Sequence, residues 1–258
     1  MKTYTDHLKM IASKGKKVLN ISRRAYLYTT KKHILIYTDS RGNNIPNEYG
    51  YKHYSTRLSN RFYVDAFLCP EKWTTIPDFL KLYKKLAAQN YDYVILHAGV
   101  VDASPRPRRS VQEIIYPEKK DILDELFGAD KIQAYHNSDL NCDYEGDKTI
   151  NLYSLEMARH SILPRLKQIP NLIWVSSNRI VPGWRGNYWK DRPANIAILD
   201  DYARLFVEEL DRVVNLTAWS LKDVQRYTFD NIHPNQAGSD YIFARLIEYI
   251  NPAPVVVA

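Results

Sequence analysis

Cysteine is scarce in this sequence and long apolar stretches are absent, and both features exclude classes of protein. The 258 residues include only two cysteines, Cys69 and Cys142. Two cysteines cannot build a disulfide framework and show no metal-ligand spacing, so we expect no metal site and a reducing, cytoplasmic location. No stretch approaches the roughly 18 apolar residues that a membrane span requires. No apolar run follows Met1 and Lys2, so we expect no signal peptide.

Acidic residues are nearly missing from the start of the chain. Residues 1–32 contain nine of the 36 Lys and Arg residues but one of the 29 acidic residues, whereas the remainder is close to neutral. We expect a basic extension over 1–32, ahead of one domain over 33–258. The extension either contacts an anionic membrane surface, an acidic polymer or nucleic acid, or is a solvated helical segment. Because the body is neutral, we expect no specific nucleic-acid partner.

The rest of the composition is that of an ordinary globular protein, with 45% hydrophobic and 25% charged residues. Short apolar segments alternate with amphipathic ones. Strands are predicted near residues 33–37, 61–68, 91–98, 172–176 and 218–220. Helices are predicted over residues 76–87, 155–166 with a kink at Pro164, 194–211, and beyond Pro234. This alternation predicts a three-layer α/β/α sandwich around a parallel sheet, with strand order 2-1-3-4-5.

Residues 103–150 interrupt this alternation. They begin with a basic run broken by prolines, 104–109, and show at most one short helix, near 121–127. Long segments without regular structure are uncommon inside compact domains and are often functional. We therefore expect an insertion after the third strand that lies over the strand ends.

Ser40 follows the first predicted strand and lies in the turn Asp39-Ser40-Arg41-Gly42. The carboxyl ends of parallel strands are where such sheets bind ligands, so Ser40 is a candidate nucleophile. Asp-Ser before Gly is also ordinary turn chemistry.

Asp230 and His233 lie three residues apart in a turn before the last predicted helix. At this spacing the carboxylate can orient the imidazole, which leaves the other ring nitrogen free to act as a general base. A serine nucleophile requires such a base. The alternative is a capping or core histidine at a helix start.

Three segments together resemble the SGNH/GDSL hydrolase family. They are 38–42 (Thr-Asp-Ser-Arg-Gly), 99–102 (Gly-Val-Val-Asp) and 230–238 (Asp-Asn-Ile-His-Pro-Asn-Gln-Ala-Gly). The resemblance implies a flavodoxin-like five-stranded sandwich and ester hydrolysis without a metal or cofactor. It assigns Ser40 as nucleophile, His233 as base and Asp230 as the orienting acid. The Gly-x-Ser-x-Gly elbow of the other large class of serine esterases is absent.

The sequence departs from the family where the oxyanion is bound. The family's third segment normally supplies an Asn side chain, and Val101 occupies that position here. Loss of one such donor costs about 10²–10³ in rate. The backbone N–H groups of Ser40 and Gly99 remain, and Asn43, Asn178 or an insertion arginine are candidate side-chain donors.

Residues 99–106 also resemble a subgroup of SGNH-like proteins found with bacterial surface-polysaccharide biosynthesis. That resemblance implies an acyl group on a sugar and makes Asp102 and Arg106 active-site groups that pair to anchor the insertion. The alternative is a surface ion pair without chemistry. Trp184 and Trp189 are candidate sugar-stacking residues.

Three functions remain open at this point. The first is an esterase or deacetylase that acts on an O-acylated carbohydrate or a small ester. The second is an O-acyltransferase that uses the same acyl-enzyme. The third is a catalytically silent SGNH fold that binds glycan or a partner, an alternative motivated by Val101.

Overall fold

The computed structural model describes residues 26–43, 52–86, 89–138, 142–188 and 190–252. Residues 1–25 of the predicted basic extension, and Trp189, lie outside the described residues. Within the described residues no helix is both long and apolar enough to cross a membrane.

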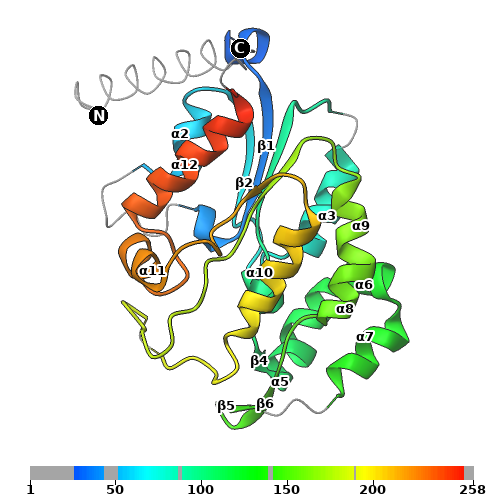
Figure 1. Ribbon diagram of the computed structural model, residues 1–258. Coiled ribbons are helices and arrows are strands. Elements are labelled where there is room, and N and C mark those ends of the chain that lie inside the picture. Colours follow the sequence, from blue (N-terminus) through cyan, green and yellow to red (C-terminus); the bar gives the residue numbers. More distant parts are fainter. Residues whose placement is uncertain (1–25, 44–51, 87–88, 139–141, 189, 253–258) are drawn as a thin grey trace, which may run out of the picture.

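Five parallel strands form the central sheet, in the spatial order β2-β1-β3-β7-β8 (Figure 1). The strands are β1 (His33–Thr38), β2 (Tyr63–Leu68), β3 (Tyr93–His97), β7 (Leu172–Val175) and β8 (Val213–Val214). Numbered along the chain, these strands have the predicted order 2-1-3-4-5. The register pairs Thr38, the last residue of β1, with His97 at the end of β3. The turn that contains Ser40 therefore leaves the sheet beside the segment that follows β3.

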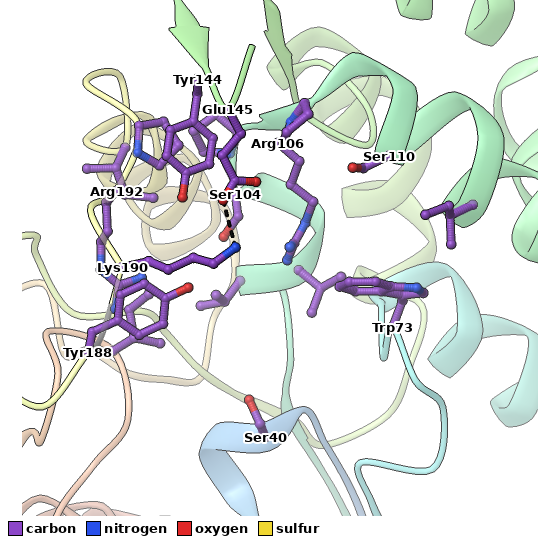
Figure 2. A pocket seen from close by; sticks show the side chains of 18 of the residues that line it. Ser40, Trp73, Ser104, Arg106, Ser110, Tyr144, Glu145, Tyr188, Lys190 and Arg192 are labelled. Carbon is purple, nitrogen blue, oxygen red and sulfur yellow. Dashed lines mark hydrogen bonds and ion pairs between the residues drawn. The ribbon is translucent and has the colours of Figure 1, made fainter. Parts of the chain in front are cut away.

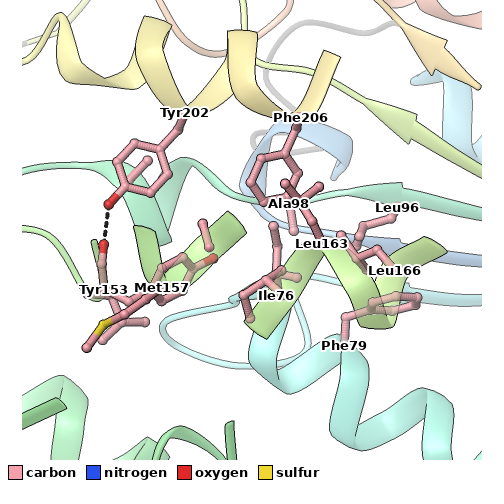
Figure 3. Close-up of a cluster of buried hydrophobic side chains, with 14 of the residues drawn as sticks. Ile76, Phe79, Leu96, Ala98, Tyr153, Met157, Leu163, Leu166, Tyr202 and Phe206 are labelled. Atoms are coloured by element: carbon pink, nitrogen blue, oxygen red, sulfur yellow. Dashed lines mark hydrogen bonds between the residues drawn. The ribbon is translucent and has the colours of Figure 1, made fainter. Parts of the chain in front are cut away.

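Helices cover both faces of the sheet because alternate side chains of β1 enter separate apolar cores. Leu35 and Tyr37 pack in one core, and Ile34 and Ile36 pack in the other. The first core includes residues of α3 (Ile76–Leu86), α9 (Leu163–Lys167) and α10 (Ile198–Glu209), and part of it is shown in Figure 3. The second includes residues of α2 (Tyr54–Ser59), α11 (Leu221–Tyr227) and α12 (Gln236–Ile250). The fold is thus the predicted three-layer α/β/α sandwich (Figure 1).

Residues 103–150 are largely regular, and the expectation of mostly irregular structure was wrong. After α4 (Val100–Ala103) come α5 (Arg108–Ser110), a π-helical turn η3 (Val111–Ile115), α6 (Tyr116–Phe127) and α7 (Ala129–His136). Strands β4 (Arg106–Pro107), β5 (Asp143–Tyr144) and β6 (Asp147–Ile150) form a small antiparallel sheet in the order β4-β6-β5. Pro117 lies in the first turn of α6, where proline is compatible with a helix.

Three further boundaries differ from the predictions. The fifth strand is β8, and the segment 218–220 is instead a turn in which Ser220 forms a capping box with Asp223 at the start of α11. Asn235, rather than Pro234, begins the last helix as its N-cap. The helix predicted over 155–166 contains a π-helical turn, η4 (Ala158–Ile162), just before Pro164.

A buried ion pair attaches the inserted helices to the sheet domain. Lys119 of α6 is 5% exposed, and its Nζ lies 2.8 Å from Oδ2 of Asp78 in α3. The same carboxylate accepts from the N–H of Thr75, at 3.1 Å, at the start of α3. Removal of one partner from such a buried pair leaves the other charge without compensation.

We predict that Lys119→Ala lowers the free energy of unfolding by about 3–5 kcal/mol. The control is Lys120→Ala, because the neighbouring Lys120 is exposed and pairs with Asp124 at the surface. That change should have little effect. Urea denaturation of both variants tests this, and equal losses would contradict it.

Candidate active site

Ser40 begins a single 3-10 turn, η1 (Ser40–Gly42), at the carboxyl end of β1. Hydrogen bonds fix the turn between its neighbouring strands. The N–H of Asp39 donates to His97 O at 2.9 Å, and the N–H of Cys69 donates to Thr38 O at 2.8 Å. Gly42 is required here, because a Cβ at this position would lie 2.3 Å from the Thr38 side chain.

The two residues that flank Ser40 form an ion pair that sequence reasoning missed. Asp39 and Arg41 are 1% and 2% exposed. Arg41 Nη2 and Nε lie 2.9 Å and 3.0 Å from the Asp39 carboxylate, which also accepts from the Arg41 N–H. Arg41 Nη1 donates to Ser177 Oγ, 3.0 Å away, beyond the end of β7. The residues on either side of Ser40 are therefore held by buried, charge-assisted hydrogen bonds.

His233 and Asp230 occupy a turn between α11 and α12, the last helix. His233 Nε2 lies 2.9 Å from Ser40 Oγ, and His233 Nδ1 lies 2.8 Å from Asp230 Oδ2. The other carboxylate oxygen, Oδ1, accepts from the N–H groups of Ile232 and His233 at 3.1 Å and 2.7 Å. The structure thus joins the three predicted residues in a continuous chain of contacts.

Asp230 is held in its charged form. Burial alone would raise the pKa of this carboxyl, but the hydrogen bonds and the charge of His233, together with the Ile232 N–H, lower the pKa below its ordinary value. Arg192, from the loop after β7, also contacts this residue. Its Nη2 donates to the backbone Asp230 O at 2.7 Å. A charged Asp230 favours the His233 tautomer that carries its proton on Nδ1, which leaves Nε2 to accept from Ser40.

The adjacent Asn231 attaches this turn to the rest of the domain. Its backbone φ is +74°, in the left-handed region. Its side-chain amide donates to Val181 O and Trp184 O, and its side-chain oxygen accepts from the Val181 N–H, all at 2.9 Å. The loop that follows β7 therefore fixes the histidine turn.

Ser40 and His233 line a cavity of about 410 Å³. Figure 2 shows Ser40 at one end, with the insertion and the loop after β7 on the opposite side. The aromatic lining residues are Trp73, Tyr144 and Tyr188, and the charged ones are Arg106, Glu145, Lys190 and Arg192. Of these charged residues, the sequence had singled out only Arg106. Trp184, the predicted stacking residue, packs against the second core instead.

Two of the candidate oxyanion donors remain available. Within the described residues, the backbone N–H groups of Ser40 and Gly99 have no hydrogen-bond acceptor. Gly99 has φ +125° and precedes α4, from which Val100 and Val101 line the cavity.

The side chain of Asn178 is not available as a donor, and that prediction was wrong. Its Nδ2 donates to Arg179 O and to Asn231 O, both at 2.8 Å, so both amide protons are used. Asn43 ends the Ser40 turn through its N–H bond to Ser40 O, and it is not among the residues that line the cavity.

Asp102 is a buried structural group and not a cavity residue, contrary to prediction. It is 1% exposed, and its Oδ1 accepts from the Ile76 N–H at 3.0 Å and from Tyr153 Oη at 2.8 Å. Within the described residues it forms no ion pair with Arg106. Burial, opposed by these hydrogen bonds, raises the pKa of Asp102 to about 7.

The site contains the groups for nucleophilic catalysis without a metal cluster. No group of three or more metal-ligating side chains occurs in the part of the chain that the structure describes. A hydroxyl, an imidazole and a charged carboxylate in hydrogen-bonded sequence can activate the hydroxyl for attack on a carbonyl carbon.

No protein-family model matches the sequence, and no curated protein matches it. Similar solved structures include a catalytic mutant of Axe2, an acetylxylan esterase from Geobacillus stearothermophilus. The two sequences are 15% identical, and the alignment covers 85% of the present chain and 94% of the Axe2 chain with a TM-score of 0.45. A protein from Parabacteroides merdae described as a GDSL-like lipase is 14% identical, with a TM-score of 0.43 over 85% and 95% of the two chains. These likenesses are distant, and we base the function on the geometry of the site.

The raised pKa of Asp102 predicts a pH-dependent stability. The pKa in the folded state, about 7, exceeds the ordinary 3.8. The contribution of Asp102 to the free energy of unfolding therefore falls by about 4 kcal/mol in total as the pH rises from about 4 to 7. Asp102→Asn should remove that decrease, whereas Asp130→Asn, at an exposed position, should not. Urea midpoints at pH 5 and pH 8 measure the difference, and parallel profiles for wild type and Asp102→Asn would contradict the prediction.

Proposed function

We propose that this protein is a serine esterase or deacetylase of the SGNH hydrolase family that acts on an O-acylated carbohydrate through Ser40, His233 and Asp230. One observation carries the proposal. Ser40 Oγ, His233 and Asp230 form contacts of 2.9 Å and 2.8 Å, and Ser40 and His233 line a cavity wide enough for a sugar ester.

In this mechanism, Ser40 Oγ attacks the ester carbonyl carbon while its proton passes to His233 Nε2. Asp230, which accepts from His233 Nδ1, stabilises the imidazolium that forms. The imidazolium then donates the proton to the leaving alcohol, and the acyl group stays on Ser40. Water attacks this acyl-enzyme and gives a proton to His233 Nε2. His233 then passes the proton to Ser40 Oγ as the C–O bond to the acyl group breaks, which releases the carboxylic acid and restores the free serine.

Backbone N–H groups of Ser40 and Gly99 stabilise the developing oxyanion in this proposal. Both come directly after the ends of adjacent strands, β1 and β3, and neither has an acceptor among the described residues. Donors that are free before the reaction do not have to break a protein hydrogen bond in the transition state.

The aromatic lining supports a carbohydrate as the acyl carrier. Trp73, Tyr144 and Tyr188 lie around the cavity (Figure 2). Aromatic side chains offer flat apolar faces, and tyrosine adds a hydroxyl that can hydrogen-bond. Both features suit a sugar ring, which has apolar C–H faces and a polar rim.

We predict that a fluorophosphonate probe labels the wild-type protein once, at Ser40, and that Ser40→Ala abolishes both labelling and ester turnover. The matched control is Ser104→Ala, because Ser104 lines the same cavity without contacting His233. Intact-mass spectrometry, with acetate release from acetylated xylooligosaccharides, reports both outcomes. A folded wild-type protein that neither reacts with the probe nor releases acetate would rule out the esterase and favour a binding module.

We predict that Val101→Asn raises ester turnover. Val101 lines the cavity with Ser40. A side-chain amide at this position adds one oxyanion donor to the two backbone N–H groups. One oxyanion donor is worth up to about 2.7–4 kcal/mol of transition-state stabilisation. The control is Val100→Asn, on the adjacent cavity residue, which should not raise kcat. A fall in kcat for Val101→Asn would show that the site is built around the apolar side chain.

A further inference from the structure

Arg106 is fixed in the cavity wall by the small antiparallel sheet of the insertion. Its backbone pairs with Ile150 in β6. Its guanidinium points into the cavity (Figure 2), and its Cζ lies 4.9 Å from the centroid of the Trp73 ring. The strand and the aromatic ring together orient the planar cation before any substrate enters.

Within the described residues no carboxylate forms an ion pair with this guanidinium, although the more distant Asp102 acts on its charge. Arg106 Nε is buried without a hydrogen-bond partner, and its side chain takes part in no described ion pair. The buried Arg41, by contrast, is paired with Asp39 and bonded to Ser177. Burial lowers the pKa of Arg106, but arginine remains protonated at neutral pH. The Arg106 side chain is partly buried, and a bound anion would pair with its charge and with the unpartnered Nε.

The remaining charges of the cavity do not supply the missing anion. Glu145 is the only acidic residue that lines the cavity in the described part of the chain, and its Oε1 lies 2.7 Å from Lys190 Nζ. Arg192 adds a further cation beside Asp230. Lys190 and Arg192 therefore each lie beside a carboxylate, and Arg106 is the cavity cation that has none within the described residues.

We propose that Arg106 binds an anionic group, a carboxylate or a phosphate, on the substrate whose ester is cleaved at Ser40. This inference rests on the proposed function and narrows its substrate class to acylated carbohydrates that carry a negative charge. The guanidinium presents two parallel N–H donors that match the oxygen atoms of either anion. Trp73, stacked against the cation, contributes an apolar face beside it.

The first test compares an O-acetylated methyl glucuronoside with its uronamide, which has nearly the same shape but no charge. For the wild type, kcat/KM for acetate release should be higher with the acid. Arg106→Gln should lower the acid-to-amide ratio by about 10- to 100-fold, and Arg106→Lys should restore part of it because lysine keeps the charge without the fork. Arg245→Gln, an exposed site on α12 that pairs with Glu248, should leave the ratio unchanged.

An acetylated methyl glucoside 6-phosphate, run beside its unphosphorylated form, distinguishes the two anions. The anion whose charged-to-neutral ratio falls more in Arg106→Gln is the one that the site selects. A ratio that is the same in wild type and Arg106→Gln for both pairs overturns the proposal, while normal acetate release would leave the esterase function standing.

The second test measures binding without turnover, so that it does not depend on the proposed function. In Ser40→Ala, calorimetry should show that the glucuronoside or the 6-phosphate binds more tightly than its neutral counterpart. Adding Arg106→Gln should weaken that binding by about 10- to 100-fold. Equal affinity for charged and neutral forms, or no binding of either anion, overturns the proposal. A charge preference without acetate release from the wild type would support the anion site and reject the esterase.

Discussion

The buried ion pair between Asp39 and Arg41 is the constraint on which the site depends. A buried pair pays a large desolvation cost and is stabilising only when its remaining hydrogen-bonding groups are satisfied. Here Asp39 also accepts from a backbone N–H, and Arg41 reaches Ser177 beyond β7. The pair therefore joins the ends of β1 and β7 across β3. Ser40, between its two members, is oriented by interactions that do not involve its own hydroxyl.

His233 reaches Ser40 because a second set of buried hydrogen bonds holds a segment almost 200 residues away. Asn231 fixes the turn to the loop after β7, and Arg192 from the same loop contacts Asp230. The strand order brings these segments together, since β1 is an interior strand and β3 alone separates it from β7, whose following loop holds the histidine turn. A nucleophile on one strand end and a base on a distant turn are thus positioned by the sheet and by one loop.

Sequence reasoning predicted those features that depend on local pattern. Buried strands such as β1 are continuous apolar runs, and the spacing of Asp230 and His233 is short enough to imply contact. It failed where the decisive partners are distant in the chain. Apart from the short helix predicted near 121–127, which is part of α6, the helices over 108–136 were missed because their buried positions are interrupted by π-helical turns and surface charges. Asn178 and Asp102 looked like site residues, but their partners, Asn231 and Tyr153, are 53 and 51 positions away.

The insertion and the sheet contribute different properties to the site. The carboxyl ends of β1 and β3 provide the hydroxyl and the backbone donors. The charged and aromatic lining residues come from β4, β5 and the turn after β5 in the insertion, from the loop after β7, and from Trp73 before α3. The buried Lys119–Asp78 pair attaches the insertion to α3, and α3 begins at Ile76, whose N–H binds Asp102 just before β4. The position of Arg106 is therefore coupled to the end of β3 through buried polar contacts. Substrate selection can change with the insertion's side chains while the reacting groups keep their geometry, because the hydrogen bonds of Arg41 and Asn231 that fix Ser40 and His233 involve no residue of the insertion.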